Sequence, residues 1–496
     1  MLRCASMDFR TGTLIFFCAA LLCQACASAP HSSAPHAGPP PLQRKTARSI
    51  IDADYDKAGA RLWFLWREGS TCGLSVLNVA DRKETRVRGL ESCPTQLDVL
   101  DDSALLLTEN DTGRLIDQEG KDVRNDVIAA ADRSHLVVKT SDGFRWIHGQ
   151  EEKLFTSNPG KRIRILPASS ALMSVAWSGE SETLRRLDFA SGKSVTLAGP
   201  FRKVDSYDVS PDEKEFVIAA DAGKGFDVAV GSTSSSALRP VGSEVLPETM
   251  VSWAPRGNKI TYLLETGDGT IVRTVHVPTA FQVAAAFDGA RVEGLAWEPR
   301  AERFAVVLSS PSASGHIRTV AYGGEAPTEL LAPELSQTAP VERLQESSRD
   351  DLVTAPRAIR YGQRYPVVIW TAVQEPYAWN DARAAVIRNS DVGVIVTPRA
   401  VGELDQPFWA SVLSYPWVDS RRLFVVAGSV SDQFIAPDDL SAPVTVIVPG
   451  SESEGTITAK GAITVRAPSH DGGVEWAAAD YIAARLAGDS AEDDHR

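Results

Sequence analysis

The feature that most constrains this chain is a repeat of 44 residues in its middle part. The prolines of four copies are spaced 44 residues apart: Pro167, Pro211, Pro255 and Pro299. Each proline follows a short strand-like run and precedes a more apolar one, as in DVSPDEKEFVIAAD at 208–221. A period of this length with four short strands per unit is typical of a propeller blade, because each unit buries its faces only against its neighbours.

Looser copies extend the repeat toward the N-terminus. They are DADYDKAGARLWFLW at 52–66, LDVLDDSALLLTE at 97–109 and IAAADRSHLVVKT at 128–140. Together the copies predict a β-propeller over residues 50–340 with seven blades, although six or eight remain possible. Trp177, Trp253 and Trp297 lie at or near the repeated turn, and we expect them to pack between blades.

The first 49 residues are interpreted as a targeting segment and a tether. Arg3 and Arg10 precede an apolar run at 14–23 that is too short to span a bilayer but suits a signal peptide. The run ends in LLCQAC, which is similar to a bacterial lipobox with Cys26 as the lipidated residue; cleavage after Ala27 or Ala29 is the alternative. Residues 1–26 are therefore expected to direct export to the periplasm or the membrane surface, and 27–49 to form a disordered tether.

Only two cysteines lie beyond this leader, Cys72 and Cys93. In an oxidising compartment they predict a disulfide, while two buried free thiols remain the alternative. The sequence contains no zinc or haem spacing, and we expect no metal or other cofactor. Four histidines without a common spacing are interpreted as surface or core residues: His135, His148, His276 and His316. The net charge of −13 disfavours nucleic acid as a partner.

The repeat ends near residue 346, and the chain that follows resembles a known family. The Ser-Pro-Asp turn at 210–212, followed by an apolar strand, is similar to the repeats of TolB-like and prolyl oligopeptidase propellers. Arg349, Asp350 and the run YPVV at 365–368 resemble the start of the α/β-hydrolase domain in the prolyl oligopeptidase (S9) family. The resemblance implies a small α/β domain at 341–488 with a mostly parallel sheet, a truncated form of the hydrolase fold, before an acidic tail at 489–496.

The stretch RLFVVAGSVSD at 422–432 has two alignments with this family. In the first, Asp419 and Arg422 fall in register and Ser429 takes the position of the catalytic nucleophile, with Ala427 and Ser431 in place of glycines. In the second, the stretch is a later core strand without a catalytic residue, and the nucleophile strand is deleted. The short stretch of chain between Ser429 and the next apolar run favours the second alignment. A nucleophile turn would have to be followed by a helix, another strand and a further crossover, which need more residues.

The other catalytic positions match the family unevenly. His470 lies where the family has its histidine, and Glu452, or alternatively Glu454, stands in place of the aspartate that orients it. The His-Gly-Gly-Pro loop that helps to bind the oxyanion is replaced by TAVQ at 371–374. In an active enzyme Ser429 would attack the substrate carbonyl and His470 would transfer the proton.

These departures favour an exported protein that has lost catalysis and binds a peptide, a glycan or an envelope protein. Its contact with the membrane would be made only through the N-terminal lipid. The alternative is an active serine hydrolase or peptidase of the prolyl oligopeptidase type. The sequence leaves both functions open.

Overall fold

The computed structural model describes residues 46–493. Excepted from this description are 102–103, 110–111, 156–157, 243–245, 267–268, 336–340, 345–350, 357–358, 361, 374–378, 428–443, 451–456, 460–461 and 469–472. The predicted signal peptide, the lipidation site Cys26 and most of the tether lie outside the described residues. Within them, no helix is both long and apolar enough to cross a membrane.

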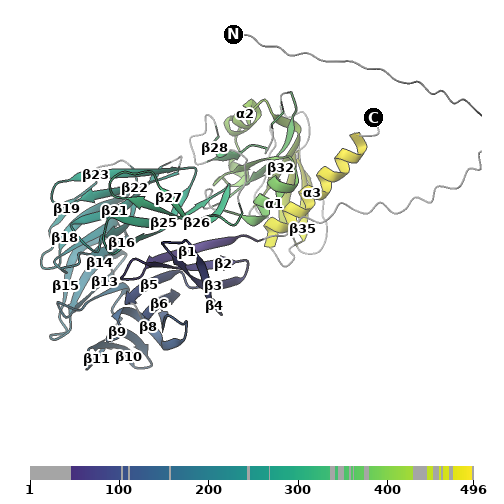
Figure 1. The fold of residues 1–496 in the computed structure, drawn as a ribbon. Helices are drawn as coiled ribbons and strands as arrows, with labels where there is room; N and C mark the ends of the chain where they lie inside the picture. Colours follow the sequence, from purple (N-terminus) through teal and green to yellow (C-terminus); the bar gives the residue numbers. More distant parts are fainter. Residues whose placement is uncertain are drawn as a thin grey trace, which may run out of the picture. The chain divides into compact units, whose positions relative to one another are not determined.

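Residues 48–331 form six antiparallel sheets in chain order (Figure 1). The first sheet consists of β1 (Arg48–Tyr55), β2 (Arg61–Glu68), β3 (Thr71–Asn78) and β4 (Glu84–Leu90). The second has seven strands: β5 (Gln96–Asp101), β6 (Ala104–Glu109), β7 (Thr112–Ile116), β8 (Asp122–Asp132), β9 (His135–Thr140), β10 (Gly143–His148) and β11 (Glu151–Phe155). The third consists of β12 (Lys161–Leu166), β13 (Ala171–Ser178), β14 (Ser181–Asp188) and β15 (Ser194–Phe201).

The remaining three sheets of this region have four strands each. They are β16 (Lys203–Val209), β17 (Glu215–Asp221), β18 (Phe226–Ser232) and β19 (Leu238–Pro240); β20 (Glu248–Trp253), β21 (Lys259–Thr266), β22 (Gly269–His276) and β23 (Phe281–Asp288); and β24 (Arg291–Trp297), β25 (Arg303–Ser310), β26 (Ala313–Ala321) and β27 (Thr328–Leu331). In every sheet the strands pair with their neighbours in sequence. Antiparallel sheets of four to seven strands in this order are consistent with a propeller-like domain.

The seven-stranded sheet arises because β8 belongs to two units. Its first half pairs with β7, as in Leu115 with Arg124, and its second half pairs with β9, as in Ala130 with Leu136. The spacing of the strands gives the reason: β6 and β9 begin at Ala104 and His135, only 31 residues apart, whereas β13 and β17 begin 44 residues apart. A unit that short has no room for four separate strands and a connection, so one long strand serves both units.

Apolar clusters join each sheet to the next. Trp63 of β2 and Leu105 of β6 share one cluster, which joins the first sheet to the second. Ile50 of β1 shares another with Ala296 of β24 and Ile317 of β26, so the last sheet packs against the first. Burial between sheets, rather than within one, therefore provides the core of this region.

The repeated prolines occupy the same place in four sheets. Pro211 follows β16, Pro255 follows β20 and Pro299 follows β24, in each case in the turn that leads to the second strand, and Pro167 does so after β12. The fixed φ of proline suits such turns, and its missing N–H is not needed by a strand.

The prediction for the tryptophans holds for two of the three. Trp253 and Trp297 end the first strand of their sheets and are buried in clusters between sheets. Trp177 lies instead on the second strand of its sheet, and 62% of it is exposed. The expectation that Trp177 packs between blades was wrong, because it occupies a different position in the repeat; its ring faces Lys161, whose Nζ lies 5.0 Å from the centroid.

Carboxylates link the first strands of successive sheets. Asp52 and Asp54 on β1 accept hydrogen bonds from the backbone N–H groups of Leu97 and Val99 on β5, each at 2.8 Å. Each bond joins residues 45 positions apart. The first strand of each sheet has a strand partner on one side only, so these carboxylates satisfy N–H groups that would otherwise be unpaired.

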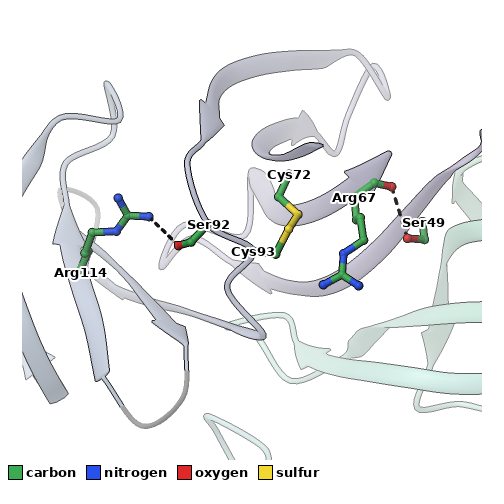
Figure 2. Close-up of a disulfide and its surroundings, with 6 residues drawn as sticks. All are labelled: Ser49, Arg67, Cys72, Ser92, Cys93 and Arg114. Atoms are coloured by element: carbon green, nitrogen blue, oxygen red, sulfur yellow. Dashed lines mark hydrogen bonds between the residues drawn. A yellow bond between two sulfur atoms is a disulfide. The ribbon is translucent and has the colours of Figure 1, made fainter. Parts of the chain in front are cut away.

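A disulfide joins Cys72 on β3 to Cys93 in the connection between the first two sheets (Figure 2). Their Cα atoms are 5.3 Å apart, within the usual range for a disulfide. The bridge closes 21 residues of chain and ties the end of the first sheet to the entry of the second.

The described residues between 341 and 493 form a mixed eight-stranded sheet with three α-helices. Its order is β28-β29-β31-β30-β32-β33-β35-β34. Its elements are β28 (Val341–Arg343), β29 (Leu352–Thr354), β30 (Tyr365–Trp370), α1 (Asp381–Asn389), β31 (Gly393–Val396), the 3-10 turn η1 (Val401–Glu403), α2 (Gln406–Ser414), β32 (Val418–Val426), β33 (Val444–Gly450), β34 (Ile457–Ala459), β35 (Ala462–Pro468) and α3 (Gly473–Asp493).

The helices cover both faces of this sheet. Phe408 and Trp409 of α2 pack in one apolar cluster, while Val386 of α1 and Ile482 of α3 pack in the other. The central strand β30 is buried at all six positions, as its continuous apolar sequence YPVVIW predicts for a strand covered on both sides. Each short helix has a side-chain cap: Asn380 accepts from Arg383 N–H, and Asp405 accepts from Phe408 N–H.

We predict that Gly315→Ala destabilises the protein. A Cβ at Gly315 on β26 would lie 2.4 Å from the backbone nitrogen of Ile50 on β1, where the last sheet approaches the first. Such overpacking costs about 1–3 kcal/mol of unfolding free energy. Urea denaturation measures this loss, and Gly323→Ala, whose Cβ would meet no atom within 4 Å, is the matched control. Equal stability of the two variants would contradict the close contact.

A second prediction concerns the pH dependence of the seam between β1 and β5. Burial raises the pKa of Asp54 from 3.8 to about 8; the bond from Val99 opposes this shift, and the carboxylates of Asp98 and Asp52 add to it. The folded state therefore holds a proton that the unfolded state has released above pH 3.8. The contribution of this proton to the free energy of unfolding is complete below pH 3.8 and is lost as the pH rises through about 8.

The measurement is the free energy of unfolding between pH 5 and pH 9. We expect it to fall more steeply in the wild type than in Asp54→Asn, which has no proton to lose. Ser206→Ala is the control, because Ser206 accepts a comparable inter-sheet bond from Val251 without titrating. This control should lose stability but keep the wild-type slope; parallel slopes for wild type and Asp54→Asn would refute the role of Asp54.

Candidate functional site

The candidate site lies at one edge of the eight-stranded sheet. β31, β30, β32, β33 and β35 are neighbours in that order and run parallel. Their carboxyl ends therefore meet at the same edge, which is where open α/β sheets bind ligands.

The three residues proposed for catalysis follow three adjacent strands but lie outside the described residues. Ser429 comes three residues after β32, Glu452 two after β33, and His470 two after β35; the alternative acid Glu454 lies in the same segment as Glu452. The topology thus directs the segments that contain them toward one edge.

The pairing of β32 bears directly on the two alignments. β32 and β33 are parallel neighbours, with Phe424 opposite Thr445 and Val426 opposite Ile447. The ladder continues to Ala427, whose N–H donates to the carbonyl of Ile447 at 2.8 Å. No strand of the described sheet stands between the strand that leads to Ser429 and the strand that leads to Glu452.

The segment after β30 is the one that the sequence resemblance aligned with an oxyanion loop. Its backbone donors are already used: Thr371 N–H donates to Val426, Ala372 N–H to Arg399 and Val373 N–H to Thr397, at 3.1, 2.7 and 3.1 Å. The Thr371 hydroxyl also donates to Val426, at 3.0 Å. An oxyanion site needs donors that are free to face the substrate. None of these three N–H groups is.

Ala372 has a backbone conformation unusual for its type. Its φ is +55°, in the left-handed region that favours glycine. The turn therefore has a conformation that glycine would adopt with less strain than alanine.

A buried ion pair holds the turn after β31. The Arg399 side chain is only 9% exposed; its Nε lies 3.2 Å from the fully buried Asp351, and its NH1 lies 3.2 Å from Asp405. The guanidinium also lies 5.3 Å from the ring centroid of Phe408. No sequence motif marked Asp351 as the partner of Arg399, although Asp351 is adjacent to Asp350, one of the residues that carry the family resemblance.

Asp419 and Arg422 have a structural role at the opposite edge of the sheet. Arg422 Nε lies 2.8 Å from Asp419, and its NH2 donates to the carbonyl of Arg364, just before β30. Burial favours the neutral form of Asp419, but hydrogen bonds from Arg421 and Arg422 outweigh it and lower the pKa. The Asp419–Arg422 ion pair holds the start of β32. It is compatible with both alignments of residues 422–432 and does not distinguish between them.

A separate cavity of about 510 Å³ lies on the sheet that begins with β5. Its lining includes four carboxylates and one guanidinium: Glu91, Glu109, Asp122, Asp126 and Arg114. Figure 2 shows Arg114 donating to the hydroxyl of Ser92, beside the disulfide; both residues line the cavity. Its volume is within the range of small-ligand sites.

Comparison with solved structures identifies the fold. Pyrococcus horikoshii acylaminoacyl peptidase matches with a TM-score of 0.57 and 9% identity, over 81% of this chain and 77% of that one. A puromycin-hydrolyzing peptidase of Mycobacterium tuberculosis matches with a TM-score of 0.58 and 12% identity, over 82% and 78%. The fold is S9-like. A puromycin hydrolase gives a TM-score of 0.57 at 12% identity, over 80% and 77%.

No protein-family model and no curated protein sequence matches the chain. The likeness to S9, prolyl oligopeptidase-like peptidases therefore rests on the fold, and the S9-like architecture covers most of the chain.

We predict that Ala372→Gly stabilises the protein. Glycine removes a left-handed strain of roughly 1–2 kcal/mol, and the greater freedom of the unfolded chain offsets part of this gain. The net effect should be about 0.5–1 kcal/mol in urea denaturation. Ala384→Gly, within α1, is the opposite control and should destabilise by about 1 kcal/mol or more. A loss of stability in Ala372→Gly would contradict the strained turn.

Proposed function

We propose that this chain is a non-catalytic member of the S9-like architecture that acts as an envelope binding protein. In this proposal residues 50–340 form a seven-bladed propeller: five four-stranded sheets are one blade each, and the seven-stranded sheet is two blades that share β8. The packing of the last sheet on the first supports a closed ring. The C-terminal sheet is a contracted α/β-hydrolase sheet.

The observation that carries the loss of catalysis is the direct pairing of β32 with β33. A nucleophile turn after β32 would be followed by a helix and another strand before the strand that leads to the acid. Only residues 427–443 separate β32 from β33, and these two strands are immediate neighbours. On this reading β32 is a core strand and the nucleophile strand has been deleted.

The occupied donors after β30 support the same conclusion. Thr371, Ala372 and Val373 use their N–H groups to bind neighbouring loops and strands. Losing one oxyanion donor costs an acyl-transfer enzyme about 10²–10³-fold in turnover. A hydrolase with this loop would have to form its oxyanion site elsewhere.

The alternative is an active serine hydrolase. Here Ser429 is the nucleophile, His470 the general base, and Glu452 or Glu454 the acid that orients the imidazole. In its favour, the segments that contain these residues follow three adjacent parallel strands.

The proposed location is the bacterial envelope, through export and a lipid on Cys26. The Cys72–Cys93 disulfide supports this location, because structural disulfides persist in oxidising compartments. The partner is a peptide, a glycan or another envelope protein. The cavity on the sheet of β5 supports a polar ligand, since its lining carries charged groups of both signs.

We predict that the purified full chain is not labelled by a fluorophosphonate probe, which reacts with activated serines. The labelling of wild type and Ser429→Ala should be equal and at background, next to a serine peptidase of known activity that labels fully. Strong labelling that disappears in Ser429→Ala would overturn the proposal and establish the hydrolase alternative.

A further inference from the structure

Two histidines that the sequence leaves unrelated lie side by side in the seven-stranded sheet. His135 begins β9 and His148 ends β10, and the antiparallel register places them directly opposite each other. Gly149 N–H donates to Ser134 in the adjacent pair, so the two histidines form the closer, non-hydrogen-bonded kind of pair. Their ring centroids are 4.6 Å apart, and the rings are inclined by 70°.

Asp132 fixes the tautomer of His135. Both carboxylate oxygens of Asp132 lie near Nδ1 of His135, at 2.9 and 2.8 Å. The backbone N–H groups of Ser134 and His135 also donate to this carboxylate, at 2.7 and 3.0 Å, so it is surrounded by donors as an ionised carboxylate requires. An ionised carboxylate only accepts hydrogen bonds, so Nδ1 of His135 carries the hydrogen and Nε2 keeps its lone pair in the neutral ring.

The contacts of His148 fix the other tautomer, with the hydrogen on Nε2. Its Nε2 lies 3.2 Å from the hydroxyl of Ser170, and its Nδ1 is buried with no hydrogen-bond partner among the described residues. A buried N–H without an acceptor is costly. The neutral ring therefore carries its hydrogen on Nε2, which donates to Ser170, and leaves a lone pair on Nδ1. Phe189, with its ring centroid 5.2 Å from that of His148, packs against this imidazole.

We propose that His135 and His148 form a two-histidine site for a divalent transition metal such as Cu²⁺ or Zn²⁺. Each imidazole has one nitrogen held by an oxygen of the protein and a lone pair on the other nitrogen. This is how metal-binding histidines are oriented, with a carboxylate, a carbonyl or a water on the remote nitrogen.

The size of the pair suits such an ion. Metal–nitrogen bonds are about 2.0–2.1 Å long, so two nitrogens on one tetrahedral ion lie roughly 3.3 Å apart. Neighbouring rings at 4.6 Å are within reach of that spacing through small side-chain rotations. Within the described part of the chain, no group of three or more His, Cys, Asp or Glu residues is placed to hold a metal. The ion therefore completes its coordination with water or with a donor from a bound ligand.

Calorimetric titration of the untagged full chain with Cu²⁺, Zn²⁺ and Mg²⁺ tests the site. We expect affinity in the order Cu²⁺ above Zn²⁺ and no binding of Mg²⁺, which prefers oxygen ligands. His148→Ala should weaken Cu²⁺ binding at least tenfold. Asp132→Asn, which no longer offers a carboxylate to His135, should weaken it about 10–100-fold.

The matched control is His276→Ala, because His276 is a strand-end histidine whose Nδ1 bonds to Thr279 at 2.7 Å. It should bind within twofold of wild type. Electron paramagnetic resonance of the Cu²⁺ complex should show coupling to two imidazole nitrogens, reduced to one or none in His148→Ala. If that variant does not fold, His148→Gln replaces it. Equal Cu²⁺ affinity and an unchanged spectrum in wild type and the His148 variant would overturn the proposal.

Discussion

The structure depends on satisfying the N–H groups of edge strands. The first strand of each sheet between residues 48 and 331 has a strand partner on one side only. At β5, β16, β20 and β24, outer N–H groups donate to acidic or hydroxyl side chains of the preceding sheet. Asp52 and Asp54 accept these bonds for β5, and Asp205 and Asp208 accept them for β20, each across 45 residues. The sequence repeat thus spaces the strands, and it also spaces the side chains that hydrogen-bond from one sheet to the next.

This way of joining sheets has an electrostatic consequence. Carboxylates that bond to backbone across a seam are partly withdrawn from water, and several of them come together between β1 and β5. Asp52 and Asp54 respond with pKa values of about 7 and 8, because burial penalises their charge. Hydrogen bonds between sheets that hydroxyl groups accept contribute the same stability at any pH. Where carboxylates accept these bonds, as between β1 and β5, the stability depends on pH.

The C-terminal sheet uses the polar groups at one of its edges for internal contacts. The parallel order of β30, β32 and β33 preserves an edge where ligands could bind. At that edge the loop after β30 turns its donors inward, and Arg399 is buried against Asp351. Both features strengthen the domain at the place where an enzyme would need free groups. In the proposed function, N–H groups that an oxyanion site would require contribute to stability instead.

Local pattern predicted much of the fold. The 44-residue spacing predicted turns at Pro167, Pro211, Pro255 and Pro299, because proline and short strand length are local properties. Two features escaped this reasoning. β8 serves two units because a short repeat must share a strand, and Trp177 is exposed because its place in the unit differs from that of the other two tryptophans.

The sequence by itself determined the repeat, the succession of strands and the resemblance to S9 peptidases, because periodicity and turn chemistry act over a few residues. Only the tertiary structure decided which side chains meet. His135 and His148 are 13 residues apart with no motif between them, and the register of β9 and β10 brings them together. Likewise, the order of β30, β32 and β33 decided what lies beside the strand that leads to Ser429. Strand register and sheet order depend on long-range burial and pairing, which no single stretch of sequence encodes.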